Sequence, residues 1–212
     1  MRIDRRLHLV IPIYSDDEGA DRIPIAYVHS TPLSEHVVER YYVALGQTYA
    51  AIFSQGFNLY AGPSYAMRIL KDVAQKNGTW LDDPARGIAG VENGLVEEMR
   101  RTTMVAVLNQ ETKRWEQLPL SVSVERGYLS PDDKREVENA IVFFTATSAT
   151  LNRELRRPIL EAAAGLWGAQ ISFLDFTAFM NSLRTSTPAA STGESQVDKE
   201  DKPASKPSSV PF

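Results

Sequence analysis

The 212-residue chain contains no cysteine. This absence excludes disulfide bridges, thiolate nucleophiles and cysteine-based zinc sites, and it is typical of a reducing compartment. A chain of this length is expected to form one domain and to bury about 70% of the surface that its unfolded form exposes. It therefore needs neither a metal nor a disulfide in order to fold.

Long apolar runs and an excess of one charge are also missing. No segment approaches the roughly 20 apolar residues of a membrane-spanning helix. The apolar stretch near the N-terminus is interrupted by His8 and Pro12, and no small-residue cleavage site follows, so a signal peptide is not expected. The 23 basic and 27 acidic residues give a net charge of −4, which argues against a nucleic-acid-binding protein. We expect a soluble, cytoplasmic protein without a membrane or nucleic-acid partner.

Histidine is scarce, with only His8, His29 and His36. These residues show none of the spacings typical of metal ligands. If Ile13 pairs with Ile23 in a hairpin, His8 and His29 point to opposite faces of the sheet. We therefore predict no metal site and no cofactor.

Two apolar segments, 7–13 and 23–29, predict a β-hairpin, and a proline in each places both strands near an edge of the sheet. A third strand is predicted near 117–124, where apolar residues alternate at Leu118, Leu120, Val122 and Val124. We expect it to lie beside the hairpin.

Capping residues and apolar periodicity predict helices over most of the remaining chain up to Leu183. The expected helices cover 31–56 (opened by Thr31 and Pro32), 63–76, 83–108, a segment beginning at Ser130 and Pro131, 158–167 and 173–183. In the helix predicted over 83–108, Gly87, Gly90 and Gly94 predict an irregular start that serves close packing or a hinge. The fold class is therefore α+β, mostly helical with a small antiparallel sheet.

The composition changes after Leu183. Residues 184–212 are dominated by Ser, Thr, Pro and Ala, and their basic and acidic residues are equal in number. Such a segment cannot bury enough apolar surface to offset the entropy of ordering it. We predict one domain over 1–183 and a disordered tail over 184–212.

No group of residues predicts catalysis. The acidic run 16–21 lacks the order of a calcium loop, and the glycines of 87–94 match no phosphate- or dinucleotide-binding motif. A Gly-x-Ser-like segment at 62–66 lacks its second glycine. The paired acidic residues and the basic cluster are typical of solvated helix ends; they are Asp82 and Asp83, Glu97 and Glu98, Asp132 and Asp133, and Arg153, Arg156 and Arg157. We predict no catalytic residues and no enzymatic activity.

Four segments give the chain a resemblance to a known family. They are YVHSTPLS at 27–34, LPLSVSV at 118–124, EVENAIVFF at 136–144, and NSLRTST at 181–187, which enters the polar tail. In the order and residue pattern of these segments, residues 1–183 resemble the tail assembly chaperones of long-tailed bacteriophages.

This resemblance implies a role without catalysis in the cytoplasm of the host cell. Such chaperones keep the long, helical tape-measure protein soluble, assist tail-tube subunits to assemble around it, and are absent from the mature virion; many are also made in a longer, frameshifted form. The alternative is a structural virion protein, such as a tail completion or connector subunit. Of the chain's own residues, Phe173, Phe176 and Phe179 are predicted to contact the partner, because the short last helix has more apolar surface than its docking needs.

Overall fold

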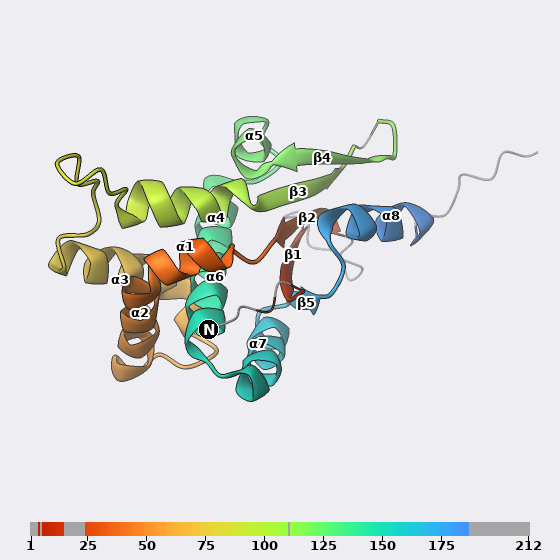
Figure 1. The fold of residues 1–212 in the computed structure, drawn as a ribbon. Coiled ribbons are helices and arrows are strands. Elements are labelled where there is room, and N and C mark those ends of the chain that lie inside the picture. Colours follow the sequence, from red (N-terminus) through yellow and green to blue (C-terminus); the bar gives the residue numbers. More distant parts are fainter. Residues whose placement is uncertain (1–3, 5, 15–23, 110, 187–212) are drawn as a thin grey trace, which may run out of the picture.

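The computed structural model describes residues 4, 6–14, 24–109 and 111–186. Within these residues the fold is α+β, as predicted: a five-stranded antiparallel sheet packs against a layer of helices (Figure 1). The acidic run 16–21 and residues 187–212 of the predicted tail lie outside the described part. Residues 184–186 were assigned to the tail, but they form the last residues of helix α8.

The sheet has the strand order β4-β3-β2-β1-β5. The strands are β1 (His8–Tyr14), β2 (Pro24–Ser30), β3 (Thr103–Leu108), β4 (Trp115–Pro119) and β5 (Gln170–Ser172). The predicted hairpin is β1–β2, but β2 is the central strand rather than an edge. The sheet tolerates both prolines, for different reasons. Pro24 is the first residue of β2. Pro12 lies beyond the segment His8–Val10, which is the part of β1 that pairs with β5.

The register of the hairpin corrects the prediction for the histidines. Ile13 pairs with Ala26, and Val10 pairs with His29. This register differs from the expected one by an odd number of residues, and such a shift moves side chains to the other face of a strand. His8 and His29 therefore lie on the same face.

The prediction of a helix over 83–108 was wrong for most of that segment. Residues 83–90 form a turn closed by a bridge between Asp83 and Ile88, which agrees with the predicted irregularity. A π-helix, η1 (Val91–Val96), and α4 (Glu97–Arg101) follow, and the chain then enters β3. Val105 is buried, as predicted, but in a strand. Pairing of β3 with both β2 and β4 outweighed the local helical pattern.

The strand predicted near 117–124 was only half correct. Strand β4 ends at Pro119, and α5 (Leu120–Glu125) begins directly after it. Pro119 lacks an amide hydrogen and its extended backbone caps the new helix, while Leu120 and Ser123, three residues apart, are buried. Strand β4 also does not touch the hairpin, because β3 lies between β4 and β2.

The described residues form eight α-helices and the π-helix η1, whereas the sequence predicted six helices. Besides α4 and α5, the α-helices are α1 (Glu35–Arg40), α2 (Tyr42–Ser54), α3 (Gly62–Lys76), α6 (Pro131–Thr150), α7 (Arg153–Leu166) and α8 (Phe176–Ser186). The helix expected over 31–56 is divided at Tyr41 and is capped by Ser34, because the amide of Thr31 still bonds to Thr102 beside the sheet. Asn152 caps α7 well before Pro158, so that proline lies inside the helix rather than at its start.

The two faces of the sheet are covered unequally. One face, with Leu9, Val28 and Val105, packs into the main core, in which Phe143 of α6 is fully buried. On the other face, Val10 and Ala106 of the sheet form a small separate cluster with Phe179 and Met180 of α8. Figure 1 shows α8 alone beside this face, away from the helical layer.

Candidate functional site

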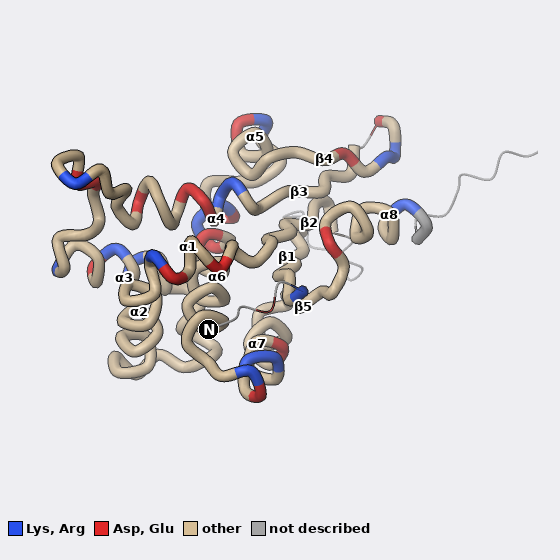
Figure 2. The backbone as a smooth tube through the Cα atoms, viewed as in Figure 1, with Lys and Arg blue, Asp and Glu red and all other residues tan. Residues whose placement is uncertain are grey.

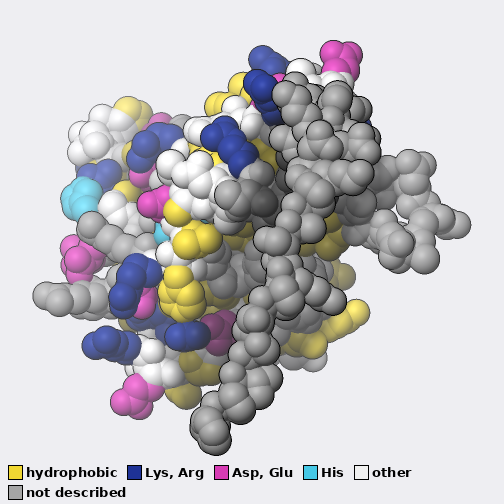
Figure 3. All heavy atoms as spheres, turned by 90° about the vertical axis from the view of Figure 1, so that its right-hand side faces the viewer, with side chains coloured by type: hydrophobic (Ala, Val, Ile, Leu, Met, Phe, Trp, Pro, Cys, Tyr) yellow, Lys and Arg dark blue, Asp and Glu magenta, His cyan; other side chains and the backbone are white. Residues whose placement is uncertain are grey.

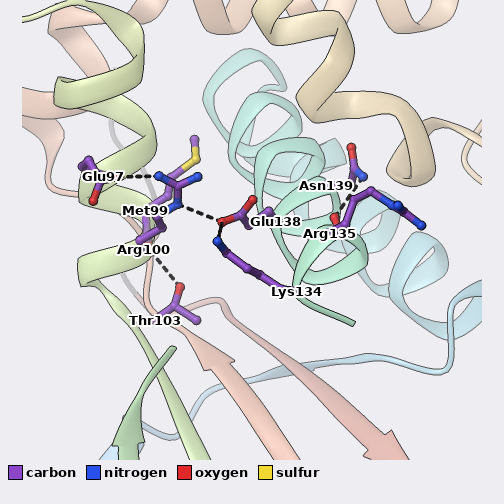
Figure 4. Close-up of polar contacts among 8 residues, drawn as sticks. All are labelled: Glu97, Met99, Arg100, Thr103, Lys134, Arg135, Glu138 and Asn139. Carbon is purple, nitrogen blue, oxygen red and sulfur yellow. Dashed lines mark hydrogen bonds and ion pairs between the residues drawn. The ribbon is translucent and has the colours of Figure 1, made fainter. Parts of the chain in front are cut away.

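The most extensive polar cluster joins α4 to α6. The Arg100 guanidinium donates to Glu138 at 2.8 Å and to Glu97, and Lys134 lies 3.8 Å from Glu138 (Figure 4). Burial lowers the pKa of Arg100, but its bonds to the two carboxylates outweigh this effect and raise it. Because Arg100 of α4 pairs with Glu138 of α6, the cluster fastens the two helices to each other.

The remaining acidic pairs and the arginine cluster also have structural roles. Asp133 completes a capping box with Ser130 at the start of α6, and Glu98 pairs with Arg101. Arg156 is buried and donates to the Leu151 carbonyl, whereas Arg157 pairs with Glu161. The expectation of a solvated arginine cluster was therefore wrong for Arg156. In Figure 2 the charged residues are spread over many elements.

His8 and His29 form a contacting pair that the sequence analysis missed. Their ring centroids are 4.9 Å apart, and His29 also contacts Phe176 and Phe179 of α8. Among the described residues, no group of three or more His, Asp or Glu side chains is arranged to hold a metal ion. The signal that would have found the pair is the correct hairpin register.

The three predicted partner-contacting phenylalanines lie in different environments. Phe179 is only 5% exposed and packs on the sheet, and Phe176 is partly buried against His29. Phe173 is 49% exposed and lies 4.7 Å below the Arg157 guanidinium. Because Phe179 holds α8 on the sheet, it is not accessible to a partner while α8 is docked. The partner-binding role of the three residues remains a prediction.

A groove of about 490 Å³ lies between α2 and the segment 77–91. Its apolar walls include Val43, Leu81 and Ile88, which are 66%, 68% and 51% exposed. Helix α2 contains no charged residue, and in Figure 2 it is tan along its whole length. An uncharged helix with exposed Tyr42 and Val43 is unusual for a surface in contact with water alone.

The far wall of the groove is held rigidly. The Asp82 carboxylate accepts bonds from the Gly90 amide at 2.8 Å and from the Asn93 side chain at 2.9 Å. These bonds lower the pKa of Asp82, the one from Asn93 most strongly. The Tyr41 hydroxyl donates to the Ala89 carbonyl at 2.9 Å and passes directly over Gly94 of the π-helix. The groove is thus a preformed feature of the fold.

Glycine at two of the predicted positions allows this close packing. A methyl group on Gly90 would lie 2.4 Å from the backbone of Trp80 and Leu81, and one on Gly94 would lie 1.7 Å from the Tyr41 hydroxyl. The predicted close packing is therefore confirmed at these two sites. The apolar walls themselves were missed. Val43 lies next to the buried stripe of its helix, and Leu81 and Ile88 lie in a turn where apolar periodicity gives no signal.

No protein-family model matches the chain, and no similar protein is found among curated proteins or solved structures. In the described part of the chain, no helix combines the length and the apolarity needed to cross a bilayer.

Proposed function

We propose that this chain is a non-catalytic assembly chaperone that holds an apolar helical segment of a partner in the groove between α2 and residues 77–91. The resemblance to tail assembly chaperones names that partner as the tape-measure protein of a long-tailed phage. The observation that carries the proposal is the preformed apolar groove beside an uncharged surface helix.

The chemistry of the groove favours an apolar occupant. Val43, Leu81 and Ile88 expose hydrocarbon to water, and burial of apolar surface is worth about 25 cal/mol per Å². An amphipathic helix is the partner element that presents apolar side chains at regular spacing along one face, and helices commonly bind in such grooves. Because α2 has no charge, the occupant needs no complementary charges on its central contact face.

The polar groups at the rim fix the direction of binding rather than its strength. Arg40 lines the groove at the end of α1, and Arg86, which pairs with Asp83 at 3.6 Å, lines its other side. Exposed charges of this kind contribute little free energy, but they bias the orientation of a partner. The apolar walls therefore supply most of the affinity.

Co-expression tests the proposal. The tape-measure protein alone is expected to aggregate, and this chain is expected to recover it as a soluble complex. Val43→Asp and Leu81→Asp place a charge in the groove at exposed positions, so the chaperone itself stays folded while the recovery is lost.

Matched controls are available on α7. Leu155 and Leu166 are also half exposed, at 50% and 54%, but lie outside the groove, so Leu155→Asp and Leu166→Asp should leave recovery unchanged. Equal recovery by the groove variants would refute this binding site. If the chain is present at a fixed copy number in mature virions, the structural-protein alternative replaces the chaperone proposal.

A further inference from the structure

We propose that α8 is a pH-sensitive cap on the second face of the sheet, held down by the neutral His8–His29 pair and released when these histidines take up protons. This device lies on a different face from the groove and does not depend on the proposed function. Figure 3 views the molecule from the side where α8 lies, and hydrophobic side chains (yellow) are visible there between charged ones.

The contact between His29 and the α8 segment is specific. Nε2 of His29 lies 3.1 Å from the Leu174 carbonyl oxygen, and because a carbonyl only accepts hydrogen bonds, Nε2 carries the proton. Nδ1 of His29 is then the unprotonated nitrogen, and it is buried without a hydrogen-bond partner among the described residues. Phe176 and Phe179 pack on the same ring at 5.4 Å.

The surroundings disfavour positive charge. His29 is fully buried and His8 nearly so, and Nδ1 of His8 is likewise buried without a partner in the described part of the chain. A second proton on His29 would place an unpaired donor in an apolar contact, and two protonated rings 4.9 Å apart would repel each other. Burial lowers the pKa of both histidines and is the largest effect on each. For His29 the hydrogen bond to the Leu174 carbonyl acts in the opposite direction, His8 lowers the pKa further, and the net shift is downward.

Few other charged groups face the pair. Among the described residues, β1 and β2 contribute the titratable side chains of His8, Tyr14, Tyr27 and His29 here, and the side chains of β3, β4 and β5 that share the face are uncharged. Asp175, directly before α8, raises the pKa of both histidines and so opposes the effect of burial. Two cations lie on or against the α8 segment: Arg157, which lies over Phe173 of the loop before α8, and Arg184 in the last turn of α8.

The direction of the pH effect follows from these shifts. The docked state lowers the two pKa values below their ordinary value of about 6.5, so docking is strongest above that pH. As the pH falls below about 6.5, His8 and His29 take up protons in the detached state at a higher pH than in the docked state. The docking constant then decreases by up to about tenfold per histidine for each pH unit, until the docked pKa values are reached.

Hydrogen–deuterium exchange of the full chain tests the cap. Amide protection in α8 is measured between pH 7.5 and 5.0, corrected for the intrinsic exchange rate, and divided by the protection of α6 in the same sample. We expect this ratio to fall at least tenfold. A ratio that stays constant with pH would overturn the proposal.

Two variants and one titration complete the test. His29→Gln combined with His8→Gln should abolish the pH dependence, whatever its effect on the level of protection, whereas His36→Gln changes an exposed histidine and should retain it. An unchanged pH dependence in the double variant would also refute the proposal. Nuclear magnetic resonance titration of the His8 and His29 imidazoles in the unaltered protein should give pKa values below the ordinary value of about 6.5; values at or above it would contradict the cap.

Discussion

At the residue scale, the packing of Tyr41 on Gly94 fixes the wall of the groove. The Tyr41 ring is buried, and its hydroxyl occupies the space where any side chain at position 94 would begin. The π-helix that contains Gly94 therefore depends on the absence of a Cβ atom. Such single-turn π segments are often found at functional sites.

Gly94→Ala is expected to destabilise the protein by about 1–3 kcal/mol, because its Cβ would overlap Tyr41. The free energy of unfolding is measured by urea denaturation. Gly46→Ala is the matched control: nothing lies within 4 Å of a Cβ at this α2 position, so alanine should stabilise by up to about 1 kcal/mol. Equal stability of Gly94→Ala and the unaltered chain would refute the packing argument.

The Arg100–Glu138 pair supplies a second prediction at this scale. A double-mutant cycle with Arg100→Gln and Glu138→Gln should give a coupling free energy of about 1 kcal/mol, because the Glu138 side chain is only 14% exposed. The same cycle on the exposed Arg157–Glu161 pair should give about 0.3 kcal/mol. Indistinguishable couplings would show that burial does not strengthen the α4–α6 ion pair.

At the scale of elements, a side-chain cap marks the start of α1, α6 and α7. Ser130 both accepts from the Asp133 amide at 3.0 Å and donates its own backbone amide to the Asp133 carboxylate at 2.8 Å. The side chain of Ser34 makes a longer capping bond, in which its hydroxyl oxygen accepts from the Val37 amide at 3.4 Å, and no capping box is found there. The start of α6 is therefore more strongly defined than that of α1.

Ser130→Ala should cost about 1 kcal/mol of unfolding free energy, and Ser34→Ala should cost about half as much or less. Chemical denaturation of the two variants side by side gives the comparison. A greater loss in Ser34→Ala would mean that tertiary contacts, rather than the cap, define the start of α6.

At the scale of the whole molecule, the sheet separates two apolar clusters of very different size. The main cluster contains no residue of α8, and the second cluster depends on Phe179 and Met180 from that helix. Regions with few buried contacts open at lower free energy than the core. Helix α8 should therefore detach without unfolding the rest.

A chain ending at Ser172 should keep the helical circular dichroism of the main domain and should bind a hydrophobic dye through its uncovered sheet face, which carries Tyr27 and Trp115. A chain ending at Ser186 keeps α8 and serves as the control, with little dye binding. Global unfolding of the shorter chain would show that both clusters form one cooperative unit.

The sequence alone determined the features that depend on neighbouring residues. The hairpin, the helix starting at Ser130 and Pro131, and the helix over 63–76 all follow from apolar periodicity, turn residues and capping within a few positions. The α+β class follows from these elements together. Close packing at Gly90 and Gly94 was one of two interpretations of these glycines, the other being a hinge, and both assumed a helix that residues 83–90 do not form.

Only the tertiary structure decided what depends on distant residues. Strand β3 exists because β2 and β4 pair with it, and the three residues of β5 are too few for a periodic signal. The meeting of His8 with His29 depends on a register that the loop length alone does not fix. The groove joins Val43 to Leu81 and Ile88 across about 40 positions of the chain, and only chain folding brings these side chains together.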